Sequence, residues 1–185
     1  CTMSLLYVDD IRGKTAAASV DLSNATSLKM PAGSVIQTVS GTYTTVGNTA
    51  STSPVQAWSG VSITPKFSTS LIKVECNWYC MHRDYYDGYA QIYRNGTGVT
   101  NQRKMIRHVG HMNSLTSPID NSANGIWMCP AWLWSFTEAA GGTSQITYSI
   151  YCWTQHASQT TWWNDASSNG NENPTSTMIL SEISQ

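Results

Sequence analysis

The sequence predicts an all-β protein, built as an antiparallel β-sandwich or jelly roll, and three observations support that fold class. Only 11% of the 185 residues are charged, against roughly 25% in an average soluble domain, which is too few to cover several solvent-facing helices. The remaining polar residues are mostly Ser, Thr, Asn and Tyr, which can cover the outer faces of strands. Alternating segments also recur between turn residues about every ten positions, a spacing typical of a sandwich.

The first half of the chain contains segments with the period of two that marks a half-buried strand. The segments 34–39 and 55–63 are expected to be strands, and the polar stretch 41–53 is expected to hold a strand and a loop. The segment 71–81 is the clearest strand, because its apolar residues all fall on one face. These residues are Ile72, Val74, Cys76, Trp78 and Cys80. One face of this strand is therefore expected to be buried, and the other to meet water or a neighbouring subunit.

The second half of the chain predicts five more strands. They span 84–95, 104–109, 126–136, 145–155 and 177–183. The first of them ends at Asn95-Gly96, a dipeptide typical of a tight β-hairpin turn. Pro130 lies within the most aromatic strand and favours a sheet edge or a bulge, because proline cannot donate to the ladder. The long polar stretch 156–175, which contains Trp162-Trp163, is expected to be a loop.

The five cysteines are expected to be buried free thiols that act as small hydrophobic groups. Cys76 and Cys80 share one strand and would be about 13 Å apart, too far for a disulfide between them. A bridge between other strands remains an alternative. A metal site is not favoured, because the sequence has no C-x-x-C pair.

Composition excludes several classes of function. The net charge of −1 argues against nucleic-acid binding, which usually needs a basic excess. No apolar run approaches the 18 or so residues of a membrane span, so membrane insertion is not expected. Carboxylates are scarce, and only Asp84 and Asp87 form a close pair in an aromatic setting, so no enzymatic activity, cofactor or metal is expected.

Two aromatic segments have the composition of a carbohydrate site. One contains Asp84, Tyr85, Tyr86 and Asp87, and the other contains Trp162, Trp163, Asn164 and Asp165. Aromatic rings stack on the C–H faces of sugars, while Asp and Asn bond to hydroxyl groups. The alternative is that Trp162 and Trp163 pack their loop against the core or against the next subunit.

The first 32 residues differ in composition from the rest of the chain. They hold too few large apolar side chains to fold alone, so they are expected to form an extended arm or a short oligomeric stalk. The arm's apolar residues are the candidates for docking onto a partner or onto copies of the same arm. These are Leu5, Leu6, Val8 and Ile11. Residues 33–185 are expected to form the β-sandwich.

Four short motifs occur in order along the chain. Residues 7–11 read Y-V-D-D-I, residues 31–39 read P-A-G-S-V-I-Q-T-V, residues 61–74 read V-S-I-T-P-K-F-S-T-S-L-I-K-V, and residues 176–183 read S-T-M-I-L-S-E-I. Their order and spacing resemble a domain of bacteriophage tail fibres and related virion appendages, notably those of phages of marine bacteria and cyanobacteria. One detail departs from that family, because Leu71 directly follows Ser70 where the family often has Ser-Lys-Ile.

The resemblance implies a homotrimeric, non-enzymatic structural protein located in the virion. The arm would attach to other virion proteins, and the β-domain would be displayed for binding to a glycan on the host surface. Low charge suits this arrangement, because few charges lose water when identical chains associate. Two alternatives remain: a capsid decoration or head-fibre protein with the same domain, and a free carbohydrate-binding module.

Overall fold

The computed structural model describes residues 31–82, 87–106, 131–165 and 174–185. Strands form the framework of this part of the chain. The chain divides into two units, Cys1–Met30 and Pro31–Gln185, and all described residues belong to the second unit. The docking candidates Leu5, Leu6, Val8 and Ile11 lie outside the described residues.

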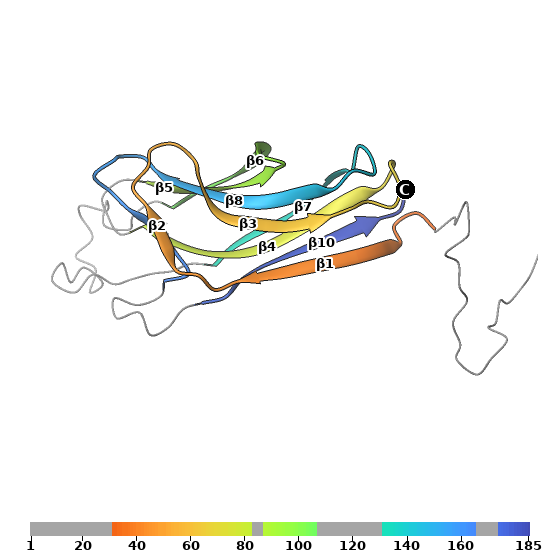
Figure 1. Ribbon diagram of the computed structural model, residues 1–185, viewed down its shortest axis with the longest axis horizontal. Coiled ribbons are helices and arrows are strands. Elements are labelled where there is room, and N and C mark those ends of the chain that lie inside the picture. The colour runs from red at the N-terminus through yellow and green to blue at the C-terminus, as the bar shows by residue number, and fades with distance from the viewer. Residues whose placement is uncertain (1–30, 83–86, 107–130, 166–173) are drawn as a thin grey trace, which may run out of the picture. The chain divides into compact units, whose positions relative to one another are not determined.

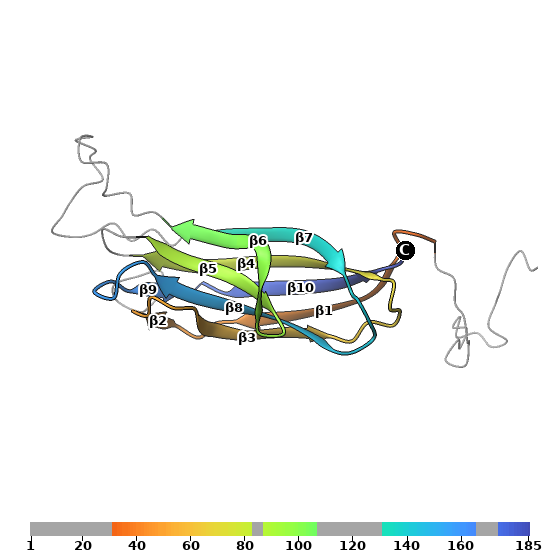
Figure 2. The ribbon, with the colours of Figure 1, turned by 90° about the horizontal axis from the view of Figure 1, so that it is seen from above.

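The strands form two antiparallel sheets that pack face to face (Figure 1). The first sheet contains β1 (Val35–Tyr43), β10 (Ser176–Ile183), β4 (Leu71–His82) and β7 (Ala131–Ala139), together with the short strands β9 (Thr161–Trp163) and β2 (Gly47–Thr49). The second sheet has the order β3 (Val55–Ile63), β8 (Ile146–Thr154), β5 (Gly88–Arg94) and β6 (Thr97–Ile106). Figure 2 looks down on the four-stranded sheet. The predicted β-sandwich is confirmed.

The order of the eight long strands is that of a jelly roll. The strand orders are β1-β10-β4-β7 in one layer and β3-β8-β5-β6 in the other. Successive long strands alternate between the layers, except for β5 and β6, which form a hairpin. That hairpin turns at Asn95 (φ 48°) and Gly96 (φ 79°), whose left-handed backbone is what a two-residue type I′ turn requires. The turn predicted from this dipeptide is therefore confirmed.

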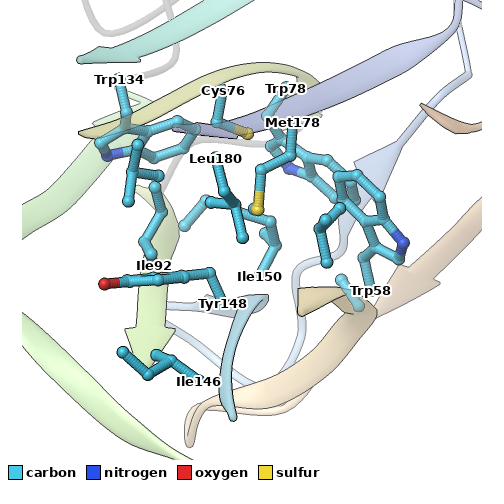
Figure 3. Close-up of a cluster of buried hydrophobic side chains, with 14 of the residues drawn as sticks. Trp58, Cys76, Trp78, Ile92, Trp134, Ile146, Tyr148, Ile150, Met178 and Leu180 are labelled. Carbon is cyan, nitrogen blue, oxygen red and sulfur yellow. The ribbon is translucent and has the colours of Figure 1, made fainter. Parts of the chain in front are cut away.

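The core lies between the two sheets (Figure 3). The apolar face predicted for 71–81 is buried, and Trp78 and Val74 are wholly inaccessible to solvent. The opposite layer supplies Ile92, Tyr148 and Ile150, which are also fully buried. Because side chains alternate along each strand, the inward residues of both sheets together fill the space between them.

The described cysteines confirm the prediction of buried free thiols. Cys76, Cys80 and Cys152 are free and buried. Burial raises the pKa of Cys76 to about 12. Burial and the neighbouring Cys152 thiol also raise the pKa of Cys80 well above its ordinary value. These thiols therefore stay protonated and act as packing groups.

Several predicted elements have different bounds in the structure. The strand expected at 104–109 begins earlier, at Thr97, because residues 97–98 already pair with β5 across the hairpin. The stretch 156–175, expected to be a loop, contains the short strand β9, which pairs with Cys80–His82 of β4. The strand expected at 126–136 is observed as β7 at Ala131–Ala139, and among the described strands it pairs with β4 alone, as an edge strand does. Pro130, which led to the prediction of an edge or a bulge, lies outside the described residues.

Three of the sequence motifs meet around one buried carboxylate. Glu182 is wholly inaccessible, and its oxygens accept hydrogen bonds from the backbone amides of Lys66 (2.8 and 2.9 Å) and Phe67 (3.0 Å). The side-chain amide of Gln37 donates to Glu182 (2.6 Å) and to the Thr64 carbonyl (2.7 Å). The 31–39, 61–74 and 176–183 motifs thus form a structural link between β1, β10 and the turn after β3.

The first and last described residues of the domain lie together at one end of the sandwich. The Gly33 amide donates to the Ser184 carbonyl (2.9 Å), and the Ser184 amide donates to the Ser34 carbonyl (2.9 Å). The opposite end holds the last residue of β4 and the first residue of β5 (Figure 1). The described domain therefore begins and ends at the opposite end of the sandwich from the last residue of β4 and the first residue of β5.

Candidate functional site

The described residues of the two predicted sugar-binding segments are Asp87 and Trp162–Asp165, and they lie at the end of the sandwich away from Gly33. Asp84, Tyr85 and Tyr86 lie outside the described residues. Asp87 is half-buried, and its backbone exchanges hydrogen bonds with Gln155: the Gln155 amide donates to the Asp87 carbonyl (2.8 Å), and the Asp87 amide donates to Gln155 Oε1 (3.2 Å). These bonds fix the entry to β5.

The structure corrects the prediction for two residues of the other segment. Trp163 is 7% exposed and belongs to the core, where a Cβ placed on Gly47 would lie 2.6 Å from its ring. Asn164 is wholly buried: its Nδ2 donates to the Tyr43 carbonyl (3.0 Å), and its Oδ1 accepts from Ser176 Oγ (2.5 Å). Both residues lie inside the sandwich, so they do not present a surface to a glycan.

Trp162 and Asp165 remain as surface candidates in that segment. Both are half-buried, and Trp162 alternates with Trp163 along β9. Because side chains alternate along a strand, the packing alternative holds for Trp163 and leaves Trp162 on the other side of β9.

A cluster of four aromatic residues lies on the outer side of the four-stranded sheet, on strands that face the viewer in Figure 2. We call it the aromatic face, and it consists of Tyr89, Tyr93, Tyr151 and Trp153. The alternation of β5 and β8 turns Ala90, Ile92, Ile150 and Cys152 inward and leaves the four aromatic residues on the other side.

The four rings form two stacked pairs between β5 and β8. Tyr93 and Tyr151 stack with ring centroids 3.9 Å apart, and Tyr89 stacks on Trp153 at 5.3 Å. Each ring thus uses one side for its partner, and Trp153 is only 9% exposed. The hydroxyls of the three tyrosines have no hydrogen-bond partner among the described residues. Burial, followed by the neighbouring Tyr151, raises the pKa of Tyr93, so its hydroxyl keeps its proton at neutral pH.

A polar hollow of about 470 Å³ adjoins the aromatic face and is lined by Gln91, Asn101 and Arg103. Gln91 lies between Tyr89 and Tyr93 along β5, and Arg103 pairs with it across the ladder. The Arg103 guanidinium lies 5.6 Å from the centre of the Tyr89 ring, within the range of a cation–π contact. Aromatic, amide and guanidinium groups therefore gather on one patch of the sheet.

A second hollow, of about 400 Å³, lies between β6 and β7, but its charged groups have structural partners. Arg94 donates to Glu138 Oε1 (3.1 Å) and to the carbonyls of Ala139 (2.9 Å) and Ala140. Glu138 Oε1 also accepts from the Tyr148 hydroxyl (2.5 Å), and burial together with this bond raises the pKa of Tyr148. These groups join the two sheets at their open edge, and we infer that their role is to stabilise the fold.

The aromatic face escaped the sequence predictions, although a signal for it is present. The alternation at 145–155 places Tyr151 and Trp153 on the polar side of a strand, where large aromatic residues are unusual. What the sequence does not reveal is that β5 lies beside β8, which brings Tyr89 and Tyr93 against them.

Comparison with known proteins adds no family. No protein-family model matches the chain, and no curated protein matches it. Within the described ranges, no three His, Cys, Asp or Glu side chains are grouped as metal ligands would be. In the same ranges no helix has the length and apolarity needed to cross a membrane.

Proposed function

We propose that this domain binds a glycan through the aromatic face, and that the chain is a bacteriophage tail fibre or virion appendage that displays the domain to the host surface. The observation that carries the binding role is a group of three tyrosine hydroxyls, without hydrogen-bond partners in the described part of the chain, beside a polar hollow on the outer face of the four-stranded sheet. Exposed clusters of large side chains on the solvent side of a sheet often mark interaction sites.

The chemistry of the patch suits a sugar better than an apolar ligand. Tyrosine hydroxyls and the amides of Gln91 and Asn101 can bond to sugar hydroxyls, and the outer parts of the rings can contact C–H groups. The hollow is lined by polar side chains, whereas a site for a drug-like apolar ligand is lined mainly by hydrophobic ones.

The proposed display role rests on the resemblance to phage fibre domains and on the placement of the chain ends. The described domain begins next to Gly33 and Ser184, at the end away from the last residue of β4 and the first residue of β5. An arm attached there would dock on the virion and leave Tyr89 and Trp153, which lie near the far end, free to meet the host. The homotrimer is part of this proposal.

Substitutions on the aromatic face are expected to weaken glycan binding. We expect Tyr151→Ala to lower affinity about two- to tenfold, since it removes one aromatic contact and a hydroxyl, and Tyr151→Phe to lower it less. The measurement is binding of the full chain to an array of bacterial surface polysaccharides and lipopolysaccharide O-chains. Leu133→Ala is the matched control, because Leu133 is 68% exposed on the other sheet.

Retention of wild-type binding by Tyr151→Ala and Tyr89→Ala would contradict a site on this face. If Trp162→Ala alone then weakened binding, the glycan site would lie at the segment near β9. If the wild-type chain bound no polysaccharide on the array, the binding role itself would be overturned.

Removal of residues 1–30 is expected to abolish incorporation into phage particles while leaving the sandwich folded. The sandwich should stay folded because its core is built from residues that lie between Ala57 and Leu180. Quantitative detection of the protein in purified particles measures incorporation, and mass measurement in solution reports whether the intact chain is a trimer. Unchanged incorporation would contradict the docking role, and a monomeric intact chain would contradict the fibre proposal.

A further inference from the structure

The polar hollow beside the aromatic face is formed by an irregularity in β6. Gln91 pairs with Arg103, but the next registered pair is Tyr93 with Gly98, so residues 99–102 stand opposite Ile92 alone. Within this bulge Asn101 has a left-handed backbone (φ 61°) and an exposed side chain. Bulges of this kind redirect side chains, and they occur often beside binding sites.

The bulge is held in place by contacts on both sides. The Gln91 side-chain amide donates to the Val99 carbonyl (2.9 Å), and Trp134 Nε1 donates to the Gln102 carbonyl (2.9 Å). A Cβ on Gly98 would lie 2.8 Å from Gln91 Nε2, so glycine gives this amide its room. The hollow is thus built by the fold itself, and a ligand would not have to organise it.

The sheet that carries the hollow has an unbalanced charge. Its strands β3, β5, β6 and β8 contain no Asp or Glu, and they contain Arg94, Arg103 and Lys104. Arg94 is paired with Glu138, and Lys104 lies over the Trp134 ring at 5.9 Å. Arg103 forms no ion pair with a described residue. Asp87 is the residue directly before β5, and it is not among the residues that line the hollow.

We propose, as a deepening of the glycan-binding function above, that this site selects acidic sugars, with the Arg103 guanidinium binding a sugar carboxylate in the hollow. A planar guanidinium offers two parallel N–H donors that match a carboxylate, and the Arg103 guanidinium carbon lies over the Tyr89 ring, 5.6 Å from its centre, beside the hollow. Gln91 and Asn101 line the same hollow and can bond to the hydroxyls of the same sugar ring. This inference rests on the proposed function.

The test compares each acidic oligosaccharide with its own methyl ester, which keeps the sugar and removes only the charge. The probes are oligomers of galacturonic, mannuronic and glucuronic acid and their methyl esters, titrated into the full chain. For at least one of the three sugars we expect the free acid to bind roughly tenfold tighter than the ester, as a charge-assisted hydrogen bond would give. We expect Arg103→Gln to remove that preference and Arg103→Lys to keep part of it.

Lys66→Gln is the matched control, since it removes one exposed positive charge at the turn after β3; it should keep the full preference. Equal binding of acids and esters by the wild-type chain would overturn the acidic selectivity and leave the glycan-binding function standing. An undiminished preference in Arg103→Gln, with its melting temperature equal to that of the wild type, would overturn the role of Arg103. If the wild-type chain bound none of these sugars and no neutral polysaccharide either, both proposals would fail together.

Discussion

Replacing Trp78 by alanine is expected to lower the free energy of unfolding by about 3–5 kcal/mol, a large part of the stability of a domain of this size. Trp78 is wholly buried on β4. Its ring stacks on Trp58 of β3 at 6.3 Å and on Tyr43 of β1 at 5.9 Å, so one side chain joins three strands from both sheets. Figure 3 shows Trp78 and Trp58 beside Met178 in the core. Its loss would leave a cavity that a sandwich closes poorly.

Urea unfolding followed by circular dichroism measures this change. Leu133→Ala is the matched control, because a side chain that is 68% exposed should change stability by no more than about 0.5 kcal/mol. Trp78→Phe should fall between the two, since it keeps part of the stacking. A loss of less than about 1 kcal/mol for Trp78→Ala would contradict the central role assigned to this cluster.

The sequence was enough to predict the fold class and the best-defined strands. The 71–81 segment alternates without interruption, and the structure buries the face that the pattern marks, because a strand with one apolar side has one way to lie against a core. The Asn95-Gly96 turn was equally readable, since its chemistry is local. Features that depend only on residues close together in the sequence were therefore predicted correctly.

Features that depend on distant pairing were not predictable from the sequence. Trp162 and Trp163 are adjacent, and only their pairing with Met81 and Cys80 of β4 decides which of them enters the core. The aromatic face likewise depends on β5 lying next to β8, about 60 residues away in sequence. Strand periodicity shows which residues share a face of one strand, but it does not show which strands pair. The loops were therefore favoured as a binding site over the sheet surface.

The motifs that resemble phage fibre domains acquire a physical reason in the structure. Gln37 and Glu182 are separated by 145 residues, yet they form a hydrogen bond of 2.6 Å. The Thr64-Pro65-Lys66 turn places the Lys66 amide on the same carboxylate. These motifs thus mark a structural junction, and they carry no information about what the aromatic face binds.

The Glu182→Gln substitution at this junction is expected to destabilise the domain by about 2–4 kcal/mol at pH 7. The Lys66 and Phe67 amides and the Gln37 amide all donate to the carboxylate, and a glutamine side chain would set its own N–H₂ group against one of them. Burial raises the pKa of Glu182, but hydrogen bonds from Lys66, Phe67 and Gln37 outweigh it and leave the pKa below the ordinary value of 4.5.

The sign of the pH dependence follows from that lowered pKa. A carboxyl group that binds its proton less tightly in the folded state stabilises the fold fully above the unfolded value of 4.5, and loses this effect as the pH falls through the lower folded value. The stability difference between wild type and Glu182→Gln should therefore be largest at pH 7 and shrink below pH 4.5. Thermal unfolding across pH 3–7 measures it.

Glu75→Gln is the matched control for this titration, since Glu75 is an exposed carboxylate paired with Lys73 at 2.9 Å. A surface pair of this kind contributes about 0–1 kcal/mol, so its removal should leave the acid branch of the stability curve almost unchanged. A difference between wild type and Glu182→Gln that stayed constant from pH 7 to pH 3 would mean that shape alone accounts for the loss. In that case the charge of Glu182 would not be what holds the three motifs together.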